Sequence, residues 1–95
     1  MSGFHIDREL VAFGEHVRAW RMVLGLTAQQ VCERADISRQ TLRKIENGEL
    51  SVSFSNVAQV LRALGQLNAV VDSVDPLNSE IGRLRAGAIR KRRAR

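Results

Sequence analysis

Hydrophobic residues recur every three or four positions between residues 8 and 24, which is the period of a helix with one buried face. Asp7 stands where an N-cap is expected, and Gly25 stands where helices commonly end. We therefore predict a first helix over residues 8–24. Its core-facing stripe consists of Leu10, Phe13, Val17, Trp20 and Leu24.

Two short helices joined by a brief turn are predicted next. Thr27, followed three residues later by Gln30, forms a capping box that starts the second helix. Asp36 lies in the turn, where an aspartate tolerates left-handed backbone. Ser38 then caps a third helix over Arg39–Asn47. The positions expected to face the core are Leu26, Val31, Cys32, Ala35, Thr41, Leu42 and Ile45.

A fourth helix is predicted between Ser53, which serves as its cap, and Gly65, which ends it. Four helices with short connections thus occupy residues 8–65. The fourth helix presents one apolar side, made of Phe54, Val57, Val60, Leu61 and Leu64.

Residues 67–74 change the pattern, because apolar and polar positions alternate there as in a β-strand. A lone strand cannot satisfy its own backbone hydrogen bonds, so we expect it to pair with the same strand of a second copy. The competing interpretation is a short fifth helix. In the strand interpretation the dimerisation residues are Leu67, Ala69 and Val71.

A further helix is predicted over residues 79–93, capped by Asn78 or Ser79. Gly82 and Gly87 each weaken it by about 1 kcal/mol. We expect this segment to become ordered only against a partner. Its thin apolar stripe consists of Leu77, Ile81, Leu84 and Ala88.

Composition narrows the class of protein. The chain has 95 residues, which suits one domain, and its lone cysteine, Cys32, excludes an internal disulfide and fits a reducing compartment. Neither a membrane-spanning run nor a signal-peptide pattern occurs, so a cytoplasmic, nucleoid-associated protein is expected. His5 and His16 lack metal-ligand spacing relative to Cys32. No catalytic motif occurs, and we expect neither enzymatic activity nor a cofactor.

The positive charge is concentrated at one end of the chain. The formal net charge is +5, and residues 83–95 carry seven basic side chains and no acidic one, which leaves −2 for residues 1–82. Such a basic tail is typical of an arm for an anionic partner, although a solvated end that aids solubility is the alternative. Any DNA contact by residues 1–82 must therefore depend on a local basic patch.

That patch lies on the predicted third helix. Two short helices joined by a turn can place the second one in the major groove of DNA. Arg39 and Gln40 lie at its beginning, and their side chains suit paired hydrogen bonds to guanine and adenine respectively. Lys44 follows Gln40 on the same face. These residues predict a DNA-reading helix.

The chain resembles the Xre/Cro-type repressors over residues 13–65, with VRAWR, GLT, SRQTLRKIENG and the closing ALG in register. The resemblance implies a mainly α, lambda-repressor-like bundle of four to five helices that binds double-stranded operator DNA as a homodimer. It implies base contacts from Arg39, Gln40 and Lys44, and an internal salt bridge between Arg21 and Glu46. The expected phosphate contacts are Thr27, Gln29, Ser38, Thr41, Arg43 and Asn47.

The chain departs from that pattern at several positions. Ala28 replaces a glutamine that contacts phosphate, which leaves Gln29 as its substitute. Asp36 replaces a glycine, and Val52 replaces a proline. Met22 and Val23 stand where charged residues are usual, and either cover the edge of the core or form a patch for a protein partner.

The strand pattern after the fourth helix resembles a narrower group, the HipB-like antitoxins. This implies an autorepressor that also binds a HipA-type kinase toxin. The alternatives are a stand-alone Xre-family regulator, and a non-specific nucleic-acid adaptor that uses the basic tail. The expected organisation is an N-terminal arm (1–7), a DNA-binding domain (8–66), a dimerisation strand (67–75) and a basic tail (76–95).

Overall fold

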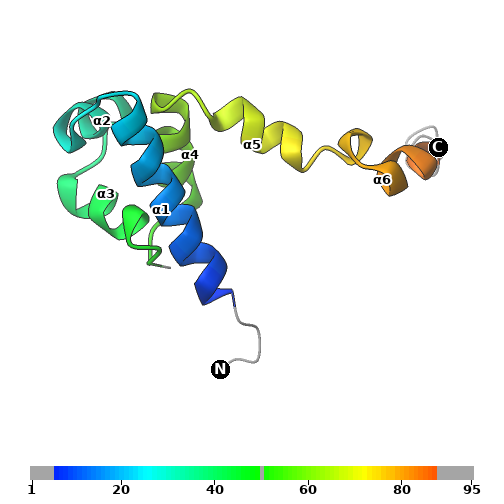
Figure 1. Ribbon diagram of the computed structural model, residues 1–95, viewed down its shortest axis with the longest axis horizontal. Helices are drawn as coiled ribbons and strands as arrows, with labels where there is room; N and C mark the ends of the chain where they lie inside the picture. The colour runs from blue at the N-terminus through cyan, green and yellow to red at the C-terminus, as the bar shows by residue number, and fades with distance from the viewer. Residues whose placement is uncertain (1–5, 50, 88–95) are drawn as a thin grey trace.

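The computed structural model describes residues 6–49 and 51–87, and these residues form helices without any β-strand (Figure 1). The mainly helical class predicted from the sequence is confirmed. Four helices make a bundle, and the remaining elements form an arm that projects from it. The elements are α1 (Asp7–Val23), α2 (Ala28–Ala35), α3 (Arg39–Glu46), α4 (Phe54–Ala63), α5 (Leu67–Ser73), the 3-10 turn η1 (Pro76–Asn78) and α6 (Glu80–Leu84).

Side-chain caps fix where the short helices begin. Thr27 and Gln30 form the predicted capping box: the Gln30 amide donates to Thr27 Oγ1 at 3.0 Å, and the Thr27 amide donates to Gln30 Oε1 at 2.8 Å. Ser38 and Ser53 cap α3 and α4 as predicted. Each cap satisfies an amide that has no partner inside its helix. The expected cap of α1 is wrong, because the helix begins at Asp7 itself.

The turn between α2 and α3 depends on one left-handed residue. Asp36 has φ of 57°, and its amide donates to the Cys32 carbonyl, which ends α2. The short polar side chain of aspartate allows this left-handed conformation at low cost. The reversal places α3 across α2, which is the arrangement that a helix-turn-helix unit requires.

A single core joins the four helices of the bundle. Val31 and Val60 are fully buried, and α2 packs against both α3 and α4. No buried side chain in the described residues is polar or charged. The buried hydrophobic residues are Val17, Val31, Cys32, Ala35, Leu42, Ile45, Val60, Leu61 and Leu64.

The predicted stripe of α1 is correct in its first half and wrong in its second. Trp20 is 41% exposed and Leu24 is 46% exposed, so neither is a core residue. Arg21 takes the inward position instead, because its guanidinium pairs with Glu46 of α3. Turning this position inward moves Trp20 to the rim of the bundle.

Gly14 allows α1 and α3 to touch through their backbones. A Cβ atom at Gly14 would lie 2.5 Å from the carbonyl oxygen of Glu46, closer than carbon and oxygen can approach. The glycine is therefore required by packing and not by its own dihedral angles. This contact sets the distance between the two helices that hold the Arg21–Glu46 pair.

The predicted strand over residues 67–74 is wrong, and the competing interpretation is correct: Leu67–Ser73 is the helix α5. Leu67, Val70, Val71 and Val74 recur at helical spacing, which the alternation of smaller and polar residues obscured. A helix closes its hydrogen bonds within the segment, so no second strand is needed. Leu67 is half-buried, whereas Ala69 and Val71 are exposed.

The arm formed by α5, η1 and α6 extends away from the bundle (Figure 1). It contacts the bundle where α5 follows α4, and α6 packs on η1. The Cα radius of gyration is 16.5 Å, against about 12 Å for a compact chain of this length. Of the predicted helix over residues 79–93, Glu80–Leu84 is present with Ser79 as its cap, and residues 88–95 lie outside the described part.

None of the helices in the described ranges combines the length and the hydrophobicity that crossing a membrane requires.

Candidate nucleic-acid interface

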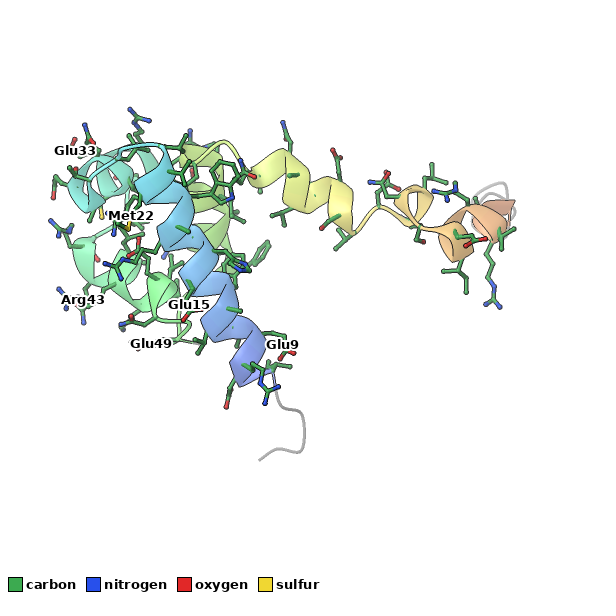
Figure 2. All side chains as sticks on the ribbon, viewed as in Figure 1. Glu9, Glu15, Met22, Glu33, Arg43 and Glu49 are labelled. Carbon is green, nitrogen blue, oxygen red and sulfur yellow. The ribbon has the colours of Figure 1, made fainter. Side chains whose placement is uncertain are left out.

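Helix α3 lies on the outside of the bundle, with one face buried and the other free (Figure 2). Leu42 and Ile45 point into the core and anchor the helix. Arg39, Gln40 and Arg43 are exposed, and Figure 2 shows Arg43 directed away from the bundle. The anchored face makes α3 a rigid support for the long polar side chains on its opposite side.

Lys44 differs from the other predicted base-contact residues because it is half-buried. A half-buried lysine commonly lays its alkyl stem on apolar surface and keeps its ammonium group in water. The structure brings Lys44, Arg39 and Gln40 together on one helix.

Two hydroxyl groups form a short chain at the N-terminus of α3. Ser38 Oγ accepts a hydrogen bond from the Thr41 amide at 3.0 Å, and Ser38 Oγ donates to Thr41 Oγ1 at 3.0 Å. The Ser38 hydroxyl proton is thus already donated within the protein. The Thr41 hydroxyl still has its own proton to donate outward.

The two phosphate contacts predicted at the start of α2 differ in whether their side chains are free to donate a hydrogen bond. Thr27 accepts from Gln30 as the helix cap and keeps its hydroxyl proton. Gln29 donates its side-chain amide to Glu33 Oε2 at 3.1 Å. A carboxylate beside that amide repels a phosphate. Gln29 in this position is therefore a poor substitute for the glutamine absent at Ala28.

An ion pair ties α1 to α3. Arg21 Nε lies 2.8 Å from Glu46 Oε2, Arg21 Nη2 lies 3.1 Å from Glu46 Oε1, and the side chains are 16% and 12% exposed. This two-pronged hydrogen bond raises the pKa of the Arg21 guanidinium. The pair holds α3 against α1 and lies beside the exposed face of α3.

A polar hollow of about 450 Å³ opens between α1, the start of α2 and α3. Arg18 lies at this hollow, whose charged lining consists of four arginines and two glutamates: Arg18, Arg21, Arg39, Arg43, Glu15 and Glu46. Sequence reasoning missed Arg18. Its position one helical turn before Arg21 was the available signal, because residues three apart share a helix face.

Cys32 is buried beneath the turn, and its thiol lies 3.6 Å from the Ser38 carbonyl oxygen. Burial raises the pKa of this thiol, since the charged form would lose its hydration. Within the ranges that the structure describes, no three histidine, cysteine, aspartate or glutamate side chains are grouped to hold a metal ion.

Comparison with known proteins agrees with this geometry. Residues 12–74 match a family model described as a helix-turn-helix domain. The chain is also 38% identical over 50 residues to an uncharacterized HTH-type transcriptional regulator from Methanothermobacter thermautotrophicus, covering 53% of this chain and 72% of that protein. No solved structure matches significantly. Because the family match spans more than half of the chain, this protein belongs to the helix-turn-helix domain family.

Proposed function

We propose that the chain is a sequence-specific DNA-binding transcriptional repressor that acts as a homodimer. The observation that carries this proposal is the exposed pair Arg39 and Gln40 at the beginning of α3, on a helix whose other face is buried. A helix of this kind fits the major groove with its N-terminal residues against the bases. The name of the archaeal relative supports the regulatory role.

In this proposal three side chains read bases. Arg39 forms paired hydrogen bonds with the two acceptors of a guanine, and Gln40 forms them with an adenine. Lys44 reaches a base acceptor or an adjacent phosphate from its half-buried position. Each well-placed bidentate contact contributes about 1–3 kcal/mol of discrimination against the wrong base.

A second set of side chains positions the protein on the DNA backbone. The Thr41 hydroxyl donates to a phosphate while it accepts from Ser38, so Ser38 acts on the phosphate through Thr41. Arg18 joins this set because it lines the same hollow as Arg39 and Arg43. The proposed phosphate contacts are Arg18, Thr27, Ser38, Thr41, Arg43 and Asn47, with Gln29 contributing only if it leaves Glu33.

The HipB-like interpretation loses its main support, because it depended on a strand where α5 is found. We therefore propose a regulator without assigning a kinase toxin as its partner. In the adaptor alternative, the basic tail supplies the nucleic-acid contact. Much of that tail, residues 88–95, lies outside the described part of the chain.

The test is selection of bound sites from random duplex DNA at a stated salt concentration, since phosphate contacts make the affinity salt-dependent. A dimer with two recognition helices should select a palindrome whose half-sites lie about 34 Å apart. With the selected site, Arg39→Ala should weaken binding by about 1–3 kcal/mol and relax the preference at one base pair.

Arg34→Ala is the matched control, because it removes an exposed arginine of α2 that does not line the polar hollow beside α3. It should leave base preference unchanged. Equal weakening of Arg39→Ala on every sequence would contradict the reading role of Arg39. Loss of all binding on truncation after residue 82, with no effect of Arg39→Ala, would favour the adaptor.

A further inference from the structure

The bundle has a second hollow, and this one is apolar. It measures about 340 Å³ and lies between α1, the end of α3 and the start of α4. Phe54, the first residue of α4, was predicted to be core but is 72% exposed at this hollow. We call it the apolar groove, and its lining residues include Leu10, Phe13, Val52, Phe54 and Val57, with Glu49 as an acidic member.

The arm carries an apolar stripe that nothing in the described chain covers. Leu77, Ile81 and Leu84 are 55%, 61% and 78% exposed, and they recur at intervals of four and three residues. Ile81 and Leu84 are three residues apart and share one side of α6, and Leu77 belongs to the preceding turn η1, on which α6 packs. Exposed apolar side chains on a short helical element are suitable anchors for a hydrophobic groove. We call these three residues the arm stripe.

Side-chain hydrogen bonds fix the arrangement of η1 and α6 in the arm. Asp75 Oδ1 accepts from the Leu77 amide at 2.9 Å, and Ser79 Oγ accepts from the Gly82 amide at 3.0 Å. Arg83 Nη1 donates to the Leu77 carbonyl at 3.0 Å. These bonds hold η1 and α6 in one arrangement, so the arm stripe is presented as a defined surface.

We propose that the arm stripe of one copy docks into the apolar groove of a second copy, and that two chains exchange arms reciprocally. The proposal rests on the homodimer of the proposed function and assigns its contact surface. A reciprocal exchange gives a closed dimer with two identical contacts about a twofold axis. It covers both exposed apolar surfaces at once.

The arm cannot readily reach the groove of its own chain. The groove lies at the N-terminal end of α4, at Phe54, whereas the arm leaves from the other end of that helix. Figure 1 shows α5 extending outward from the end of α4, which it contacts. Folding back would break the contact between α5 and α4. A second copy can fill the groove without that loss.

Charge complementarity supports the same occupant. The arm stripe is flanked by Arg83 and Arg85, and residues 83–95 carry seven positive charges. The groove has the carboxylate of Glu49 in its lining. Arg83 and Arg85 outnumber the one carboxylate of α6, Glu80, so the basic side of the arm meets the carboxylate of the groove.

The size of the contact also favours reciprocal exchange. A standard protein interface buries about 800 Å² on each partner, which one stripe of three aliphatic side chains does not supply. Exchange buries two stripes and two grooves, which brings the total toward that of a stable dimer. An unreciprocated contact would leave one groove and one stripe open.

The experiment is disulfide cross-linking between variants of the full chain that each carry one added, exposed cysteine. Phe54→Cys and Ile81→Cys are prepared separately, and each replaces an exposed side chain, so folding should persist. The wild-type chain is the control, because its Cys32 is buried. Under mild oxidation, a mixture of the two variants should form a covalent heterodimer, whereas neither variant alone should.

Other outcomes overturn the proposal. A covalent dimer of Ile81→Cys alone indicates that arms pair with each other. A chain carrying both substitutions that closes on itself as a monomer indicates an intrachain contact. Absence of the mixed dimer at concentrations where sedimentation shows association indicates that another surface joins the copies.

Sedimentation of charge variants provides a second measurement. Ile81→Asp and Phe54→Asp should each weaken self-association at least about tenfold, because each places a carboxylate in an apolar contact. Ala19→Asp, which alters an exposed apolar residue of α1 that lines neither hollow, should not. Base preference measured with Arg39→Ala tests the proposed function separately, so a dimer lacking arm exchange can still prove to be a DNA-binding regulator.

Discussion

The bundle and the arm are both helical and both carry apolar stripes, yet only the bundle has a core. The stripes of α1 to α4 face one another and bury nine hydrophobic residues. None of the residues of α5, η1 or α6 is buried. Side chains cap η1 and α6, through Asp75 and Ser79, as they cap α2, α3 and α4 in the bundle. Local hydrogen bonds therefore suffice to shape an element, but they do not supply it with a packing partner.

This difference predicts where substitutions act. In the bundle, a lost contact should lower the free energy of unfolding of the whole domain. In the arm, the same kind of change should alter the arm and its association with a second copy, and leave the bundle intact. Matched pairs of substitutions, one in each region, test this distinction.

The largest expected effect comes from truncating a core leucine. Leu42 is 2% exposed, and Leu42→Ala should destabilise the bundle by about 2–5 kcal/mol through lost burial and a residual cavity. Leu84 is 78% exposed, and Leu84→Ala should change stability by less than about 0.5 kcal/mol. Urea denaturation at concentrations where the chain is monomeric measures both. Similar losses for the two variants would show that the arm belongs to the core.

A second pair concerns glycines at close backbone contacts. Gly14→Ala places a Cβ 2.5 Å from the Glu46 carbonyl oxygen, so it should force α1 from α3 and cost about 1–3 kcal/mol. Gly82→Ala meets the backbone of Pro76 inside the arm. It should open the corner between η1 and α6 and reduce self-association, with the bundle's unfolding midpoint unchanged. A lower midpoint for Gly82→Ala would contradict the independence of the two regions.

The helix caps form a third pair with a smaller effect. Ser38→Ala removes the cap of α3 and should cost about 1 kcal/mol of bundle stability. Ser79→Ala removes the equivalent cap of α6 and should lower only the helical content of the arm, as seen by amide hydrogen exchange. Unaltered exchange in the arm of Ser79→Ala would mean that its cap contributes little.

The smallest expected effect depends on pH. Burial raises the pKa of the Cys32 thiol above its ordinary value. The stabilisation from the buried neutral thiol is complete below the unfolded-state pKa, and it is lost as pH rises through the folded-state pKa. The bundle should therefore weaken under alkaline conditions, and Cys32→Ala should reduce this pH dependence of the urea midpoint. The chain has no tyrosine, which simplifies the titration.

Local features were predictable because their causes lie within a few residues. Thr27 with Gln30, Ser38, Ser53 and Ser79 start helices through hydrogen bonds that span three positions. Asp36 takes the left-handed conformation at the predicted turn. The exposed face of α3 followed from the spacing of Leu42 and Ile45 in the same way.

Features that depend on distant partners were predicted less well. Trp20 fits the apolar period of α1, but Arg21 takes the inward position because Glu46 lies opposite it on α3. Phe54 fits the stripe of α4, but its place in the first turn puts it outside the core. Residues 67–74 carry apolar side chains that suit either a strand or a helix, and a short run cannot distinguish the two.

The helix starts, the turn at Asp36 and the polar face that begins with Arg39 and Gln40 follow from the amino-acid sequence, because they depend on neighbours along the chain. Three features emerged from tertiary packing: the side of α1 that faces inward, the position of Arg18 beside the arginines of α3, and the uncovered apolar stripe of the arm. Those outcomes depend on side chains far apart in sequence, and burial is a property of the packed assembly and not of a segment.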